Sequence, residues 1–183
     1  MDIKTTFKQW LVIATAAHYK LERYTRPTFV GDKPVPEDLN ELTIGQLIEL
    51  SELGDTNQSL YKVTEIILGL TAEETNRARA VDVVRLVGWT FGEVERINKL
   101  FEKLRTEPTR REKQAGVERL QFGLFGMLDW YAQRMRIQNH DDVLTVPWAR
   151  IYKCMDMDAR KAQYERRLSE IAAKELNHKN QRR

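Results

Sequence analysis

The chain has 183 residues, of which 42% are hydrophobic and 31% are charged, a balance typical of a soluble globular protein rather than a disordered one. The net charge of +3 is too small for a protein that binds nucleic acid strongly, and the single cysteine, Cys154, excludes an intrachain disulfide. No apolar run approaches the ~18 residues of a membrane span, and no signal peptide is recognisable. We therefore expect a protein of a reducing cytoplasm, without contact with a membrane.

The first forty residues predict a helix followed by a loop. Apolar side chains recur at intervals of three and four between residues 3 and 24, which is typical of a helix with one buried face. Residues 24–40 contain three prolines, and because proline lacks an amide donor and fixes φ, this segment is expected to be a loop. Within it, Thr28–Val30 is the candidate for a short N-terminal extended segment.

Two capping boxes mark the starts of short helices in the N-terminal half. In each, a threonine hydroxyl accepts from the amide three residues later, and the side chain there reaches back; the pairs are Thr43 with Gln46 and Thr71 with Glu74. Gly69 stands where a helix commonly ends. Together with the apolar spacing, these signals predict helices over residues 43–53, 58–70 and 71–77.

The longest apolar stripe predicts a helix over Val81–Leu104, which would be about 36 Å long. Another helix of this chain, or another protein, must cover that stripe. Residues 105–111, with Pro108 and no apolar side chain, are expected to form a hinge. The hinge would separate an N-terminal helical region, 1–104, from a C-terminal helical region, 112–183, although the two could also form one continuous domain.

The C-terminal half is expected to contain three helices. The first is predicted over Glu112–Ile137, with Gly123 and Gly126 inside it, where each glycine costs about 1 kcal/mol relative to alanine. Close approach of another helix, or a kink, would explain these glycines. A short helix is predicted over 146–154 and a strongly charged one over 156–176, before a basic tail. The predicted fold class is therefore all-α, an irregular multi-helix bundle with at most a short N-terminal extended segment.

The chain carries no recognisable catalytic or cofactor-binding motif. The phosphate-binding loops G-x-x-x-x-G-K-[ST] and G-x-G-x-x-G and the nucleophile motif G-x-S-x-G are missing from the sequence. One Glu-x-x-His pair, Glu175 with His178, lies in the polar tail, whereas a di-iron site needs two such pairs on inward-facing helices. We therefore expect no enzyme activity, no cofactor and no metal site.

Aromatic residues gather on the two longest predicted helices. They would form a core if those helices pack together, or a contact surface for another protein if some of them are exposed. The candidates for partner binding are apolar residues of these helices: Val84, Phe91, Val94, Phe101, Phe122 and Phe125. Both interpretations stay open for each of the six.

Residues 35–97 carry a continuous pattern of helix caps and apolar positions. Its members are Glu41, Leu42, Thr43, Leu47, Leu50, Asp55, Val63, Ile66, Ile67, Leu70, Thr71, Glu73, Glu74, Asp82, Val83 and Leu86. In this pattern the segment, about a third of the chain, resembles phage tail assembly chaperones. The N-terminal helix is longer than that group leads us to expect, and the half from Glu112 onwards has no counterpart.

The resemblance implies a helical, non-enzymatic protein made in the host cytoplasm during phage assembly. It would bind hydrophobic helical segments of a tail protein, namely the tape measure or tail tube proteins, and it could form a homo-oligomer. Two alternatives remain. One is a structural subunit of the virion, such as a connector, tail or packaged protein. The other is a small helical nucleic-acid-binding regulator, although acidic neighbours dilute both basic patches of the sequence.

Overall fold

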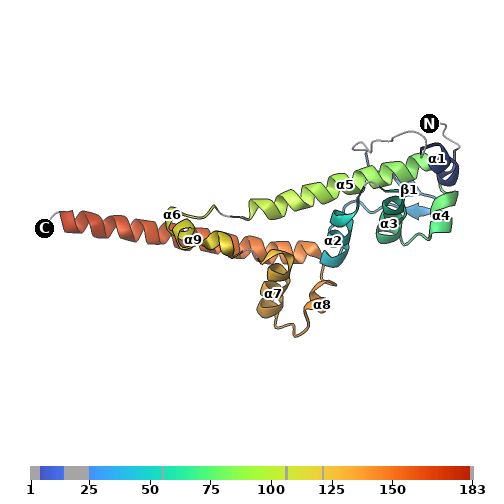
Figure 1. The fold of residues 1–183 in the computed structure, drawn as a ribbon. Helices are drawn as coiled ribbons and strands as arrows, with labels where there is room; N and C mark the ends of the chain where they lie inside the picture. The colour runs from blue at the N-terminus through green and yellow to red at the C-terminus, as the bar shows by residue number, and fades with distance from the viewer. Residues whose placement is uncertain (1–4, 15–24, 55, 106, 121, 182–183) are drawn as a thin grey trace.

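The computed structural model describes residues 5–14, 25–54, 56–105, 107–120 and 122–181, arranged as in Figure 1. The described chain is mostly helical, with a small antiparallel hairpin near the N-terminus, so the predicted all-α class is confirmed. The N-terminal half contains α1 (Phe7–Ala14), β1 (Phe29–Val30), β2 (Lys33–Pro34), α2 (Ile44–Glu52), α3 (Asn57–Leu68), α4 (Ala72–Arg77) and α5 (Ala80–Lys103). The C-terminal half contains α6 (Arg110–Gln114), the 3₁₀ helix η1 (Val117–Arg119), α7 (Gly123–Met135), α8 (His140–Val143) and α9 (Trp148–Gln181).

The capping boxes of the N-terminal half form as predicted. At the start of α2, the Thr43 hydroxyl accepts from the Gln46 amide at 3.1 Å, and the Gln46 side chain accepts from the Thr43 amide at 3.0 Å. Thr71 and Glu74 make the same two hydrogen bonds at the start of α4. Gly69 ends α3 in the left-handed conformation, with φ of 66°, which glycine adopts at low cost. The predicted extended segment is the first strand of the β1–β2 hairpin.

α5 has the apolar face that its sequence predicts, and helices of the same chain cover it. Val83, Leu86, Val87 and Ile97 are completely buried. The covering helices are α1, α2 and α3, which Figure 1 shows gathered along α5. Most of the core therefore lies in the N-terminal half, and the apolar face of α5 is largely occupied by the fold itself.

The start of α9 joins the C-terminal half to the segment around the start of α2. The Trp148 amide donates to the Leu42 carbonyl at 2.9 Å, and the Ile44 amide donates to the Val146 carbonyl at 2.8 Å. The indole N–H of Trp148 also donates to the Leu39 carbonyl, at 2.6 Å. The two halves are therefore held together by hydrogen bonds as well as by the segment predicted as a hinge.

The predicted helix over Glu112–Ile137 is wrong, because this segment forms three shorter elements. α6 begins at its own capping box, in which Thr109 pairs with Glu112. The hydrogen bonds from Thr109 hold the pKa of the Glu112 carboxyl below its ordinary value. Gly116 and Gly123 have φ of 81° and 57°, a left-handed conformation that the interior of an α-helix does not contain. α7 therefore begins at Gly123 instead of running through it.

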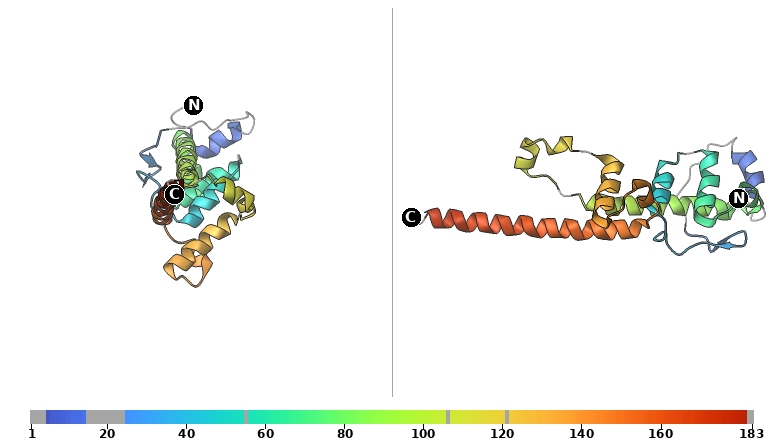
Figure 2. Two further views of the ribbon diagram at one scale, coloured as in Figure 1. Left: turned by 90° about the vertical axis from the view of Figure 1, so that its left-hand side faces the viewer. Right: turned by 90° about the horizontal axis from the view of Figure 1, so that it is seen from below.

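One further boundary differs from the prediction. The expected break before Asp156 is wrong, because α9 is one helix of 34 residues. No glycine or proline interrupts it there, and Asp156 pairs with Arg160 one turn later, at 2.9 Å. The C-terminal part of α9 extends beyond the rest of the fold in Figure 1 and in the right view of Figure 2. At the N-terminus, α1 matches the described part of the predicted first helix, and residues 15–24 lie outside the described residues.

Candidate interaction surface

Exposed apolar side chains gather around the first turn of α7. The members are Leu120, Phe122, Leu124 and Phe125, which we call the α7 patch. Phe122 is 69% exposed and Phe125 is 62% exposed. Several large apolar side chains exposed to water within one short segment are typical of a surface that binds another protein.

Gly123 and Gly126 determine how the α7 patch is presented. The φ of Gly123 is 57°, so the chain turns into α7 through a conformation that would strain most other residues. A Cβ atom on Gly126 would lie 2.5 Å from the Cβ of Phe122, which is too close for any real contact. Phe122 can therefore fold back over α7 because position 126 has no side chain. The predicted close approach is found at Gly126, where Phe122 of the preceding turn makes it rather than a second helix, and no atom of the described residues beyond the chain neighbours comes within 4 Å of a Cβ built on Gly123.

A hollow of about 390 Å³ opens beside the α7 patch, between α7 and α9. Its lining consists of Phe122, Gly123, Gly126, Met127, Trp130, Met155 and Asp158. The one carboxylate among them, Asp158, pairs with Arg134 of α7 and thereby raises the pKa of that guanidinium. Because this charge is compensated and the other lining side chains are apolar, the hollow is suited to a large apolar side chain of a partner.

Buried and polar contacts hold α7 in place behind the α7 patch. Tyr131 is 1% exposed, and its burial raises the pKa of the phenol. Asp129 Oδ1 lies 3.0 Å from His140 Nε2 of α8, and the Phe125 ring stacks on the His140 ring with centroids 5.1 Å apart. The patch is therefore carried by a helix whose position is fixed by the fold, which lowers the entropy cost of binding.

A second row of exposed apolar side chains runs along α9, from beside α7 to the part of the helix beyond α6. Its members are Met157, Tyr164, Leu168 and Ile171, each more than half exposed, and we call this row the α9 stripe. Intervals of seven, four and three residues place these side chains on one face of the helix. In the part of the chain that the structure describes, no element covers that face closely enough to bury them.

The six residues predicted for partner binding divide between the core and the surface. Val84 and Val94 are buried, Phe91 and Phe101 are half-buried against the core, and Phe122 and Phe125 are exposed. The two valines contact other helices of this chain, so they present no surface to a partner in this fold. The two exposed phenylalanines are the members of the predicted set that the structure brings together, in the α7 patch.

Sequence reasoning did not assign Leu120, Leu124 or the α9 stripe to a surface. The apolar spacing of the predicted helix over Glu112–Ile137 places Leu120 and Leu124 on its apolar side, and the structure breaks that helix at Gly123. For the α9 stripe a signal was available in the sequence. The residues between the members of the stripe are almost all charged or small, which predicts that the rest of this part of α9 faces solvent and that the apolar face of the helix is narrow.

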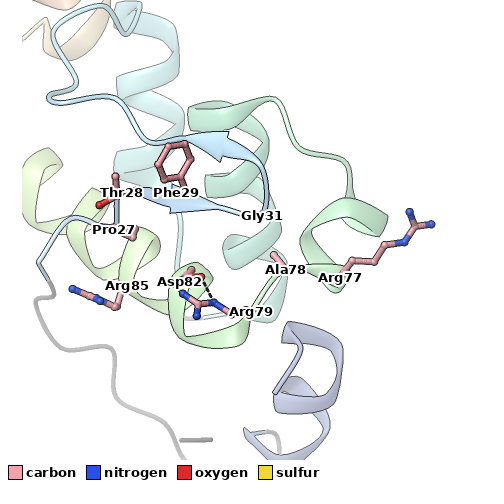
Figure 3. A pocket seen from close by; sticks show the side chains of 9 residues that line it. All are labelled: Pro27, Thr28, Phe29, Gly31, Arg77, Ala78, Arg79, Asp82 and Arg85. Atoms are coloured by element: carbon pink, nitrogen blue, oxygen red, sulfur yellow. Dashed lines mark hydrogen bonds and ion pairs between the residues drawn. The ribbon is translucent and has the colours of Figure 1, made fainter. Parts of the chain in front are cut away.

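A second hollow, of about 440 Å³, lies between the hairpin and the start of α5, and Figure 3 shows its lining. Three arginines line it, but they do not form a free cationic cluster. Arg79 pairs with Asp82 at 2.7 Å, Arg85 donates to the Thr25 hydroxyl at 2.7 Å, and Arg77 points away from the hollow in Figure 3. Asp82 compensates the charge of Arg79, and the guanidinium of Arg85 is held by a neutral hydroxyl, so the arginines do not converge on one point of the hollow as a site for an anion would require.

The described residues give no sign of a metal centre. Within the ranges that the structure describes, no three or more His, Cys, Asp or Glu side chains are grouped so that they could hold a metal ion. Among the same residues, no helix combines the length and the apolar character needed to cross a bilayer.

Comparisons of the chain with protein-family models, with curated proteins and with solved structures find no match. The α7 patch and the α9 stripe are therefore the features from which a function can be argued.

Proposed function

We propose that this chain is a non-enzymatic phage assembly factor, similar to tail assembly chaperones, which binds hydrophobic helical segments of a tail protein on the α7 patch. The supporting observation is the exposure of Phe122 and Phe125 on a helix whose other side is fixed in the fold by Leu128, Tyr131 and Ala132. The pattern of caps and apolar positions over residues 35–97 supports the same kind of protein.

The α7 patch and the neighbouring hollow suit an amphipathic helix as the bound segment. Such a helix presents apolar side chains at intervals of three and four residues, which can lie across exposed rings while one of them enters an apolar hollow. Each Å² of apolar surface removed from water on both partners contributes about 25 cal/mol to the association. A tape measure protein has long helical segments that aggregate when exposed, so it is the kind of client that the α7 patch would bind.

Replacing both Phe122 and Phe125 with serine is expected to weaken client binding about tenfold or more, because large aromatic anchors dominate the energetics of an interface. The measurement is co-expression of the tagged chain with the tape measure or tail tube protein of the same phage. The recovered complex and the soluble fraction of the client are then quantified. The thermal midpoint of the chain alone should change little, because both rings are exposed in the fold.

Phe29→Ser is the matched control for this experiment. Phe29 is 52% exposed, but it lies on β1 of the hairpin rather than in the α7 patch. The control variant should bind the client as the unchanged chain does. Full client binding by the Phe122→Ser, Phe125→Ser chain would contradict the proposal, and an equal loss in the Phe29→Ser chain would indicate non-specific adhesion.

A structural subunit of the virion is the second candidate, favoured by the projecting α9 with its exposed stripe. A neighbouring subunit could cover such a helix permanently, as subunits of stable complexes do. Mass spectrometry of purified particles separates the two candidates. A chaperone should be recovered from lysate with its client and be missing from particles, whereas a structural subunit should be present in particles at a fixed copy number.

A further inference from the structure

We propose that α9 pairs with α9 of a second copy of this chain, as a parallel two-stranded coiled coil along the α9 stripe. The pairing uses a surface other than the α7 patch and does not depend on the proposed function. Three features support it: the side of α9 that the fold leaves free, the spacing of the stripe, and the charges on either side of the stripe.

The contacts of α9 with α5 and α6 lie on the side away from the α9 stripe, and α7 reaches the flank of the stripe at Asp158, which pairs with Arg134. Tyr152 packs edge-on against Phe101 of α5, with ring centroids 5.5 Å apart. Two heptads later, and so on nearly the same side of the helix, Arg166 donates to Glu112 of α6 at 2.8 Å. The stripe residue Tyr164 is 60% exposed although it lies within one turn of Arg166. α5 and α6 thus lie along one side of α9, and the stripe is open to a partner.

The α9 stripe follows the heptad repeat abcdefg of a coiled coil. Met157, Tyr164 and Ile171 occupy successive d positions. Leu168 then occupies an a position, and Lys161 occupies the a position one heptad earlier. A single polar residue at an a position favours a defined two-stranded state at a cost in stability. Since the stripe is only about 21 Å long, the pair is expected to dissociate on dilution.

The residues that flank the stripe carry opposite charges on its two sides. The g positions hold Lys153, Arg160, Arg167 and Lys174, and the first two e positions hold Asp158 and Glu165. In a parallel pair, each g residue meets the e residue of the following heptad on the other helix, so Arg160 faces Glu165 of the partner subunit. In an antiparallel pair, g would meet g and e would meet e, and like charges would oppose. The charges therefore select a second copy of this chain in parallel orientation.

The ion pairs that these residues make within one chain do not prevent them from pairing with the second copy instead. Arg160 pairs with Asp156 at 2.9 Å, and Lys161 lies 3.8 Å from Glu165. The side chains of Arg160, Lys161 and Glu165 are all more than half exposed, and exposed pairs of this kind contribute little because water screens them. Asp158 is already held by Arg134, so the contact of Arg160 with the partner's Glu165 is the one that decides orientation.

Sedimentation equilibrium of this chain over a concentration series tests the pairing. We expect a reversible equilibrium between one and two copies. Leu168→Ser combined with Ile171→Ser should weaken the association about a hundredfold or more, because two apolar side chains lose their burial. Both are exposed in the single chain, so its circular dichroism and melting should stay unchanged. A chain that stays single at every concentration, or a dimer that tolerates both substitutions, would overturn the proposal.

Charge exchange tests the parallel orientation. Arg160→Glu alone should weaken the dimer, and adding Glu165→Arg should restore it, because opposite charges again face each other at both symmetric contacts. Glu170→Arg is the control, since it changes the net charge as Glu165→Arg does but lies at a c position, away from the stripe. A dimer that the double exchange fails to restore, or that Glu170→Arg weakens equally, would count against the paired charges.

Discussion

Replacing Trp148 with alanine is expected to lower the free energy of unfolding by about 3–5 kcal/mol, the range for truncating a buried aromatic side chain. Trp148 is 3% exposed, and the centroid of its ring lies 6.1 Å from that of Phe101 and 6.2 Å from that of Tyr152. The truncation would open a cavity where α9 meets α5. It would also remove the indole N–H that donates to the buried Leu39 carbonyl at 2.6 Å, and a buried acceptor without a donor adds to the loss.

Chemical denaturation followed by far-ultraviolet circular dichroism measures this loss, since indole fluorescence changes with the substitution itself. Trp148→Phe is the control, because it keeps an aromatic ring in the site and removes only the indole N–H and part of the volume. Trp148→Phe should lower the free energy of unfolding by about half as much as Trp148→Ala, or less. A loss below about 1 kcal/mol for Trp148→Ala would contradict the packing described. Separate transitions for the two halves in the unchanged chain would support a hinge at residues 105–111.

The helix starts of the N-terminal half could be predicted because their signals are local. Thr43 and Thr71 each carry their capping partner three residues later, so a few adjacent residues contain the whole interaction. The same signature at Thr109 and Glu112 starts α6, yet the prediction began a long helix at the second of these residues instead. The sequence signal was present there, and the apolar spacing that follows concealed it.

The division between core and surface could not be predicted, because helical spacing identifies an apolar face but not what covers it. Val84 and Phe122 are candidates for one partner surface on the same ground, and core packing is the open alternative for both. Val84 is buried by helices of its own chain, whereas Phe122 is exposed and stands just before Gly123, whose left-handed conformation breaks the predicted helix. That break depends on a positive φ at one glycine, and a glycine in the sequence fits a helix interior, a kink or a helix start equally well.

Contacts between the two halves leave little signal in the sequence. They depend on backbone hydrogen bonds between residues about a hundred positions apart, such as that from the Ile44 amide to the Val146 carbonyl. Backbone groups are the same in every residue, so composition and spacing do not report their partners. The one sequence feature that such a contact does require is a small residue where two backbones approach closely, and Gly45 supplies it.

Gly45→Ala is expected to lower the free energy of unfolding by about 1–3 kcal/mol, although alanine is the better helix former. The Gly45 amide donates to the Leu144 carbonyl at 2.9 Å, and a Cβ on Gly45 would lie 2.9 Å from that same oxygen. The obstacle is a backbone atom, which cannot rotate away as a side chain could. The start of α2 would therefore have to move from the segment that precedes α9, and the hydrogen bonds between the halves would lengthen.

Gly54→Ala is the matched control, since no atom of the described residues other than its chain neighbours lies within 4 Å of the Cβ it would add. Gly54→Ala should change the free energy of unfolding by no more than about 0.5 kcal/mol, as a substitution at an ordinary surface position does. Gly45→Ala and Trp148→Ala disturb the same junction between α2 and α9, so their losses should not add fully when combined. Denaturation curves of both single variants and the double variant give this coupling. If the two losses add fully, Gly45 and Trp148 stabilise separate parts of the fold. If Gly45→Ala leaves the free energy of unfolding unchanged, the junction between α2 and α9 is looser than its hydrogen bonds indicate.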